Sequence, residues 1–425
     1  MSRGNVKLTS FAFMAAAAMW LLLALSASLT AQSNALQGFS YKVLYRFTGQ
    51  QDGATPYAGV IRDDDGNLYG TAVRGGDLSC NRGFGCGVVF KINSAGVQTP
   101  LHAFTGGTEG ALIDSSGGVV RDQDGNLYGT APYGGDPDCP VPGGGGCGVV
   151  YKIDSQGTYS VIHTFNGADG FTPYQGLLLG SDGYLYDTTF QGGGDGCGGF
   201  GCGVVFKMDR QGNEAFLHSF QETSEWSLPS SFGTPARDNE GNLYVTTTDG
   251  SQGFVLKVDP QGNETDLYPF TGGADGGDPP SGVVLDGAGN VYGPTSSGGT
   301  NGRGVIFKVD AMGNETVLYS FTGAADSGTP YGHLIRDAHG NLYGTTFSHS
   351  GVIYKLYPGG HLTVLYTFQG STDGGHPYSG LFRDRNGNLY GTASDGGDLG
   401  CNNGHGCGVV FELSACSSAI CRGQN

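Results

Sequence analysis

Three short motifs recur seven times in a fixed order along this chain. The first is close to G-N-L-Y, with its tyrosine at Tyr69, Tyr128, Tyr186, Tyr244, Tyr292, Tyr343 and Tyr390. The second is close to G-V-V-F-K. The third is close to L-Y-x-F-T-G, with its phenylalanine at Phe47, Phe104, Phe165, Phe220, Phe270, Phe321 and Phe368. A unit of roughly 50 residues that recurs in this way predicts a repeat architecture.

Each unit holds four short runs rich in β-branched and aromatic residues, separated by Gly and Asp. In one complete unit these runs are GGVV, NLYGTA, GVVYKI and YSVIHTF. Such runs are typical of β-strands, and no convincing helical period is present. Four strands in a unit of this length indicate one blade of a propeller. The sequence therefore predicts an all-β fold, a seven-bladed β-propeller with four antiparallel strands per blade.

The order of the motifs predicts how the ring closes. A lone fourth strand, 41–47, comes first, and three strands of an incomplete unit, around 381–413, come last. Pairing of this N-terminal strand into the last blade would account for every motif. The alternative is an open solenoid, which would leave both incomplete ends as exposed edges.

The D-x-x-G-N sequence before each first motif admits two interpretations. As an EF-hand loop with Gly66 at the sixth position, it would need a carboxylate at the first, where Ile61 stands. As a turn, Asp122 would accept hydrogen bonds from its own backbone and Gly125 would take a positive φ. We expect the turn.

The first residues have the pattern of a secretory signal peptide. Arg3 and Lys7 precede an apolar run, and small residues follow, with cleavage expected after Ala31 or, alternatively, Ser28. An uncleaved membrane anchor is the alternative. The expected division is a signal peptide at 1–31, a short linker at 32–40, the propeller at 41–413 and a C-terminal tail at 414–425. We expect a secreted or periplasmic monomer without a membrane span after cleavage.

The ten cysteines form close pairs. Four pairs fall between the second and third strands of neighbouring blades, and one falls in the tail: Cys80 with Cys86, Cys139 with Cys147, Cys197 with Cys202, Cys401 with Cys407, and Cys416 with Cys421. In an exported chain such pairs predict disulfides. Zinc is the alternative, but the matched C-x-x-C spacing of zinc ribbons is missing.

In a propeller, the loops between blades and those between the second and third strands share one face, and here both are long. Acidic side chains recur there in the loops between blades, four of these loops end in Pro-Tyr, and one holds Trp226. The predicted ligand-binding residues are Asp52, Tyr57, Asp169, Tyr174, Trp226, Asp275, Asp326, Tyr331, Asp373 and Tyr378, with Glu109 equivalent to these acids. Aromatic faces and carboxylates suit a carbohydrate. The alternative is that these residues only order Gly-rich loops and pack between blades.

Four histidines map to the same face, and imidazole is a common ligand of zinc and copper. They are His333, His349, His376 and His405, and their spacing fits no metal motif. His102, His163 and His218 occupy a strand position that is tyrosine in other units, which indicates a structural role. We predict no metal site and no cofactor.

The charge and the motifs exclude several function classes. The net charge of −17 opposes a phosphate backbone, so nucleic acid is excluded as a partner. No nucleophile elbow, H-E-x-x-H or phosphate-binding loop is present.

The units, for example GNLYGTTFSHSGVIYKLYPGGHLTVLYTFQG, resemble the GloVer tandem-repeat family of exported bacterial proteins. The likeness extends from Tyr41 to about Leu413, and the family carries no assigned reaction. The leading hypothesis is an exported, non-catalytic binding or scaffold propeller with a carbohydrate ligand on the long-loop face. The alternatives are a polysaccharide lyase or hydrolase that uses face carboxylates with Tyr or His, and a platform for an envelope protein.

Overall fold

The computed structural model describes the protein over residues 38–112, 116–139, 145–194, 196–220, 230–231, 233–248 and 252–415. Tyr41–Glu412 form one compact unit. The predicted signal peptide, linker residues 32–37 and Trp226 lie outside the described residues.

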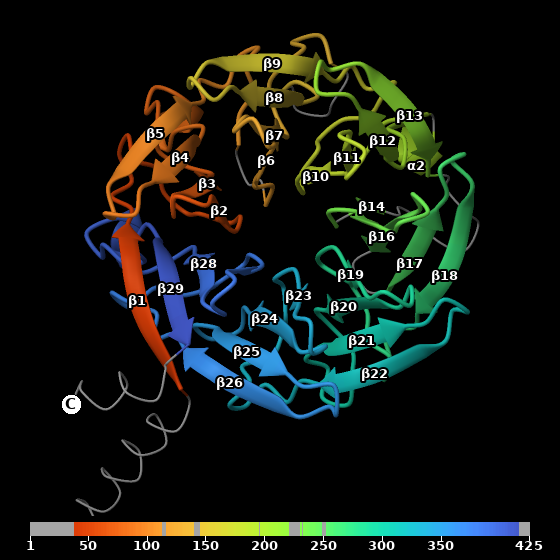
Figure 1. Ribbon diagram of the computed structural model, residues 1–425. Coiled ribbons are helices and arrows are strands. Elements are labelled where there is room, and N and C mark those ends of the chain that lie inside the picture. Colours follow the sequence, from red (N-terminus) through yellow and green to blue (C-terminus); the bar gives the residue numbers. More distant parts are fainter. Residues whose placement is uncertain are drawn as a thin grey trace, which may run out of the picture. The chain divides into compact units, whose positions relative to one another are not determined.

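Seven antiparallel sheets stand around a central axis as the blades of a propeller (Figure 1). The four strands of each blade are named a to d from the innermost to the outermost. They follow one another in the chain except in blade 7, where strand d is the first strand, β1. The strands in this order are β2 (Ile61–Arg62), β3 (Leu68–Ala72), β4 (Val88–Ile92) and β5 (Gln98–Ala103) in blade 1; β6 (Val119–Arg121), β7 (Leu127–Ala131), β8 (Val149–Ile153) and β9 (Tyr159–Thr164) in blade 2; β10 (Leu178–Leu179), β11 (Leu185–Thr188), β12 (Val204–Met208) and β13 (Glu214–Ser219) in blade 3; β15 (Ala236–Arg237), β16 (Leu243–Thr248), β17 (Gly253–Val258) and β18 (Glu264–Phe270) in blade 4; β19 (Val284–Leu285), β20 (Val291–Thr295), β21 (Val305–Val309) and β22 (Glu315–Ser320) in blade 5; β23 (Ile335–Arg336), β24 (Leu342–Thr346), β25 (Val352–Leu356) and β26 (Leu362–Thr367) in blade 6; and β27 (Phe382–Arg383), β28 (Leu389–Ala393), β29 (Val409–Ala415) and β1 (Phe39–Arg46) in blade 7.

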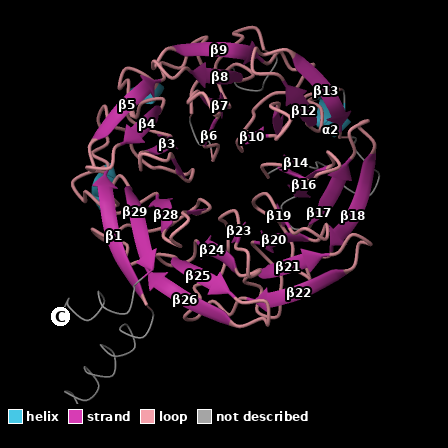
Figure 2. Ribbon diagram, in the orientation of Figure 1, coloured by secondary structure: helices cyan, strands magenta, loops and turns pink. Residues whose placement is uncertain are grey.

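Blade 4 departs from the other blades by one extra short strand, β14 (Ser230–Ser231), which also pairs with β16. Helical turns within the described residues are confined to loops that carry cysteine pairs (Figure 2): η1 (Asn81–Gly83), α2 (Gly196–Gly199) and η2 (Asn402–Gly404). The prediction of an all-β propeller with seven four-stranded blades is confirmed.

The ring closes as predicted, because β1 is the outer strand of blade 7 beside β29. The backbone N–H of Phe47 donates to the carbonyl of Gly408 at 3.1 Å. Tyr41 stacks on Tyr366 of blade 6 with ring centroids 3.9 Å apart, and lies 5.6 Å from the ring of Phe411. The first strand therefore joins blade 7 and also contacts blade 6.

The recurring D-x-x-G-N sequence forms the a–b turn of its blade. Asp122 Oδ1 accepts from the backbone N–H of Asp124 and of Asn126, and its Oδ2 accepts from the Asn126 amide and the Tyr128 hydroxyl. Gly125 has φ +88°, which an L side chain rarely adopts. These bonds confirm the turn interpretation.

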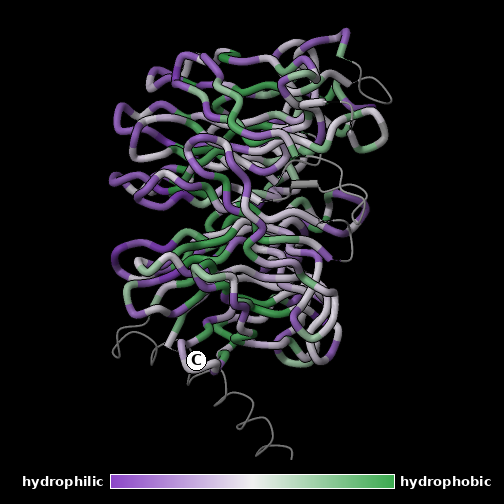
Figure 3. The backbone as a smooth tube through the Cα atoms, turned by 90° about the vertical axis from the view of Figure 1, so that its right-hand side faces the viewer, coloured by the Kyte–Doolittle hydropathy of each residue, from purple (hydrophilic) through white to green (hydrophobic). Residues whose placement is uncertain are grey.

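Large aromatic side chains fill the spaces within and between blades. The aromatic residue of strand c lies over the glycine of strand b, so that a Cβ on Gly70 would stand 2.8 Å from the ring of Phe90. Apolar residues lie mainly in the interior, and the turns that project on one side are mainly hydrophilic (Figure 3). Burial of these rings is the main stabilising contribution, because each removes a large apolar area from water.

Blade 3 carries a carboxyl group at the position of this strand b glycine. Asp187 is fully buried opposite Phe206, and its Oδ1 accepts from the backbone N–H of Thr188 at 2.8 Å. Burial raises the pKa of Asp187 to about 7.

Four of the five predicted disulfides are present, in the b–c loops of blades 7, 1, 2 and 3: Cys401–Cys407, Cys80–Cys86, Cys139–Cys147 and Cys197–Cys202. The bridge of blade 7 packs against the loop that leaves β1, where a Cβ on Gly49 would stand 2.6 Å from Cys401 Sγ. These bonds indicate an oxidising, extracellular or periplasmic environment. Among the described residues, no helix has the length and apolar character needed to cross a membrane.

The fifth predicted disulfide is not among the bonds that the structure shows. Its two cysteines, Cys416 and Cys421, follow the end of β29 at Ala415 and lie outside the described residues. The disulfide between Cys416 and Cys421 therefore stays a prediction from the sequence.

Candidate functional site

One cavity of about 750 Å³ is lined by the segments that lead into strand a of every blade. Four Pro-Tyr steps lead from the loops between blades into these inner strands, and their tyrosines, Tyr57, Tyr174, Tyr331 and Tyr378, all line it. Because each tyrosine holds the same place in its own blade, the symmetry of the ring brings side chains that are far apart in the sequence to one central space.

Most of the cavity's aromatic side chains form a continuous arc. The ring centroid of Tyr378 lies 4.9 Å from that of Tyr57, 5.4 Å from Tyr331 and 4.5 Å from Phe347. The three tyrosines line the cavity at blades 6, 7 and 1, and Phe347 packs against Tyr378 without lining the cavity. The arc presents apolar faces beside tyrosine hydroxyls.

A second aromatic group stands on the side of blade 3. Tyr174 lies edge-on to Phe190, with centroids 5.8 Å apart, and its hydroxyl is 2.5 Å from the hydroxyl of Tyr133. Tyr174 and Phe190 both line the cavity. Aromatic surface is therefore available on two sides of the same space.

One polar group on the cavity wall is buried without a hydrogen-bond partner. It is the Oγ of Ser281, at the entry to blade 5. Buried polar atoms are rarely left unpaired, and such atoms beside a cavity are candidates for contact with a ligand.

The cavity is electrically neutral. Among the described residues that line it, none is Asp, Glu, Lys or Arg. Burial raises the pKa of Tyr378 to about 12 and also raises that of Tyr331, so both hydroxyls stay protonated at neutral pH. Burial lowers the pKa of His333, which favours the neutral ring. The site thus offers hydrogen bonds and apolar faces to a neutral ligand.

The predicted acidic residues do not line this cavity. Asp52 accepts from the hydroxyl of Tyr45 on strand d and from the backbone N–H of Thr48. Asp275, Asp326 and Asp373 each accept the same two kinds of bond within their own loops. Glu109 and Asp169 likewise accept from backbone N–H groups of their loops. These carboxylates order the loops at the outer strands, which is the alternative raised by the sequence.

The four predicted histidines are not brought together. His333 lines the cavity, whereas His376 Nδ1 pairs with Asp395 Oδ2 at 2.8 Å, an interaction that raises the pKa of His376. His349 and His405 are exposed in b–c loops. Trp226 lies outside the described residues, so its role stays a prediction.

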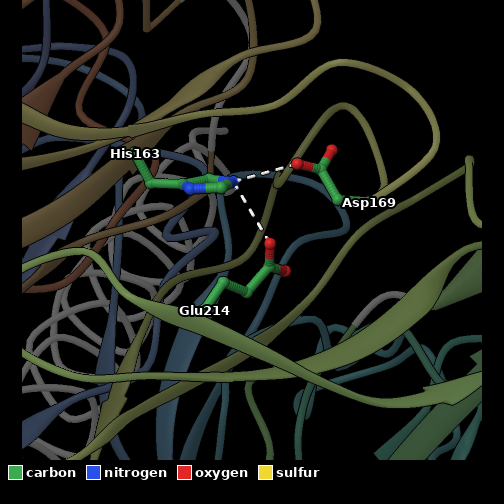
Figure 4. Close-up of side chains that lie close together, drawn as sticks. All are labelled: His163, Asp169 and Glu214. Atoms are coloured by element: carbon green, nitrogen blue, oxygen red, sulfur yellow. Dashed lines mark ion pairs between the residues drawn. The ribbon is translucent and has the colours of Figure 1, made fainter.

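Sequence reasoning missed one group of metal-ligating side chains. His163, Asp169 and Glu214 place a ring nitrogen and two carboxylate oxygens within 4.8 Å of one another (Figure 4). The sequence indicates only a structural role for His163, because tyrosine replaces it in other units. Glu214 comes from the next blade, so only the register of neighbouring blades could have indicated the group.

Comparison with known proteins identifies one matching family model. The model of the Gloeobacter/Verrucomicrobia repeat matches residues 31–201 and 195–411. Among curated proteins, none matches.

Two solved structures that match this chain are similar to it at low sequence identity. A gluconolactonase of Xanthomonas campestris is 14% identical, with 63% of this chain and 78% of that chain covered and a TM-score of 0.39. The calcium-binding protein regucalcin of Agrobacterium tumefaciens is 15% identical, with 72% and 93% covered and a TM-score of 0.44. Likenesses at this level say nothing of ligand or activity.

Proposed function

This chain belongs to the Gloeobacter/Verrucomicrobia repeat family, the GloVer family that its units resemble, and from that premise we propose that it is an exported, non-catalytic carbohydrate-binding propeller. The proposed site is the central cavity. The observation that carries the proposal is the convergence of Tyr57, Tyr174, Tyr331 and Tyr378 from four different blades on this one space.

The chemistry of the cavity fits a neutral sugar. Sugar rings present C–H faces that pack on aromatic rings, and hydroxyls that both donate and accept hydrogen bonds. The tyrosine arc supplies the faces, while Ser281 Oγ supplies an unpaired polar atom. A volume of about 750 Å³ lies in the usual range for small-ligand pockets.

Binding without hydrolysis is favoured by the placement of the carboxylates. Glycoside hydrolysis in most families uses two acidic side chains on either side of the scissile bond. In the described part of the chain the cavity wall has none. The acids of the long-loop face are engaged by their own loops and by strand d hydroxyls.

Substitution of Tyr378 by alanine should weaken glycan binding at least about tenfold, because Tyr378 contacts both flanking tyrosines of the arc. Tyr378→Phe keeps the ring and should bind more tightly than Tyr378→Ala. The measurement is retention of the purified protein on a panel of soluble and insoluble polysaccharides, with newly released sugar ends scored in the same incubation.

Tyr357→Ala is the matched control, since Tyr357 is an exposed tyrosine outside the cavity wall. If the protein is still retained on the polysaccharide in both Tyr378→Ala and Tyr331→Ala, the cavity is not the glycan-binding site. Release of sugar ends would instead identify an enzyme. If no polysaccharide is retained, a protein of the envelope becomes the better partner. Loss of retention in Trp226→Ala alone would move the site to the loop that enters blade 4.

A further inference from the structure

Neighbouring blades meet at a recurring slot formed by three sequence positions. They are the strand d position held by His102, His163 and Tyr268, the acid six or seven residues further along the chain, and the strand d residue of the next blade that lies four positions before that blade's own equivalent of the first position. The described slots hold Tyr45, Asp52 and Gln98; His102, Glu109 and Tyr159; His163, Asp169 and Glu214; Tyr268, Asp275 and Glu315; Tyr319, Asp326 and Leu362; and Tyr366, Asp373 and Tyr41.

The slot between blades 2 and 3 combines histidine with two carboxylates. His163 Nε2 lies 3.2 Å from Asp169 Oδ2 and 3.3 Å from Glu214 Oε2 (Figure 4). Asp169 is held by its other oxygen, Oδ1, which accepts from the backbone N–H of Asn166 at 2.9 Å. Its Oδ2 is thereby presented to the ring nitrogen.

The contacts of the ring nitrogen are ion pairs only when the imidazole is protonated. His163 Nε2 and Glu214 Oε1 are both shielded from solvent. An imidazolium paired with a carboxylate approaches to about 2.7–2.9 Å, which is closer than either distance here.

The two distances from His163 Nε2 to the carboxylate oxygens match those between ligands of a tetrahedral metal ion. Bonds of about 2.0–2.1 Å at tetrahedral angles place two ligand atoms about 3.3 Å apart. We propose that His163, Asp169 and Glu214 bind one divalent transition-metal ion between blades 2 and 3. One nitrogen and two carboxylate oxygens form a donor set that zinc accepts, with a fourth position left for water.

A tyrosine at the His163 position distinguishes the slot of blades 4 and 5, which also holds two carboxylates. In the slot of blades 4 and 5, Asp275 and Glu315 also supply two carboxylates, but the Tyr268 hydroxyl donates to Asp275 Oδ2 at 3.1 Å. A phenol proton occupies the space between the oxygens there. His163 instead supplies a lone pair when neutral, as a metal ligand must.

The test measures Zn²⁺ binding to the purified, tag-free chain after chelator treatment, by titration calorimetry and by metal analysis after dialysis. We expect about one Zn²⁺ per chain, and a rise in Tm when it binds, because the ion joins two blades. His163→Tyr and Glu214→Gln should each weaken binding at least about 100-fold, since loss of a mere second-shell contact already costs about 10–100-fold.

These variants are chosen so that the protein still folds. Tyrosine occupies the His163 position in four other slots, and glutamine occupies the Glu214 position as Gln98. His102→Tyr is the matched control, because its slot holds one carboxylate and a tyrosine, and binding should be unchanged in it. Absence of bound zinc in the native chain overturns the proposal, as does zinc binding that survives both His163→Tyr and Glu214→Gln with unchanged affinity.

Discussion

Replacement of Phe47 by alanine should lower the free energy of unfolding by about 3–5 kcal/mol, the usual cost of removing a fully buried phenyl ring. Phe47 follows β1 and is 0% exposed, with its ring 5.2 Å from that of Phe90 in blade 1. It therefore packs where the first strand, the last blade and the first blade meet. The measurement is urea denaturation followed by tyrosine fluorescence and circular dichroism.

Phe321→Ala provides the matched comparison. Phe321 holds the same repeat position after β22, is also 0% exposed, and lies 5.4 Å from the ring of Tyr354. Both variants should lose a similar free energy of unfolding if β1 stabilises the ring as much as an internal strand does. A loss below about 1 kcal/mol for Phe47→Ala, beside a full loss for Phe321→Ala, would mean that β1 can leave the ring without unfolding it.

Substitution of Asp187 by asparagine should stabilise the protein at pH 8 by about 4 kcal/mol, and should change little near pH 3. The pKa of Asp187 is about 7 in the folded protein against an ordinary value of 3.8, and each pKa unit corresponds to about 1.36 kcal/mol. Below pH 3.8 the carboxyl is protonated in both states and contributes no difference. Between pH 3.8 and 7 only the unfolded chain ionises, so folding becomes less favourable as the pH rises, and above pH 7 the deficit is constant.

The check is the difference in unfolding free energy between Asp187→Asn and the native chain, measured from pH 3 to pH 9. Taking the difference removes the contributions of other titrating groups such as Glu214 and Glu315. Asp209→Asn in the exposed c–d turn of the same blade should show no gain at high pH, because hydrogen bonds with Asn213 lower the pKa of Asp209. A difference for Asp187→Asn that is the same at every pH would contradict the explanation.

The architecture was predictable because each local signal agreed with the others. The Asp of the a–b turn, the positive φ of Gly125 and the paired cysteines act over a few residues, so their consequences can be read from the sequence. The seven-fold count then determined the number of blades and the closing strand. None of these inferences required knowledge of side-chain direction.

The candidate site was predicted only in part, for a physical reason. The tyrosines of the Pro-Tyr steps line the central cavity. Asp52 and its equivalents instead accept a hydrogen bond from the hydroxyl of a strand d tyrosine that lies seven residues earlier in the chain. That seven-residue spacing is visible in the sequence and could have indicated the pairing. The approach of Glu214 to His163 depends on how one blade packs on the next, which no local pattern encodes.

Closure through β1 also sets the order in which the chain can be completed. The first strand of the ring must wait for strands that come much later in the chain: the Tyr41 hydroxyl, for example, donates a hydrogen bond to the backbone carbonyl of Asp373, 332 positions further on. Until then β1 has no partner, and its open edge is a template for contacts with other chains. The disulfides of blades 1, 2 and 3 need no such delay, since each joins cysteines at most 8 residues apart. Maturation should therefore begin with early oxidation of single loops and end with one slow, long-range step that makes the ring resistant to proteases all at once.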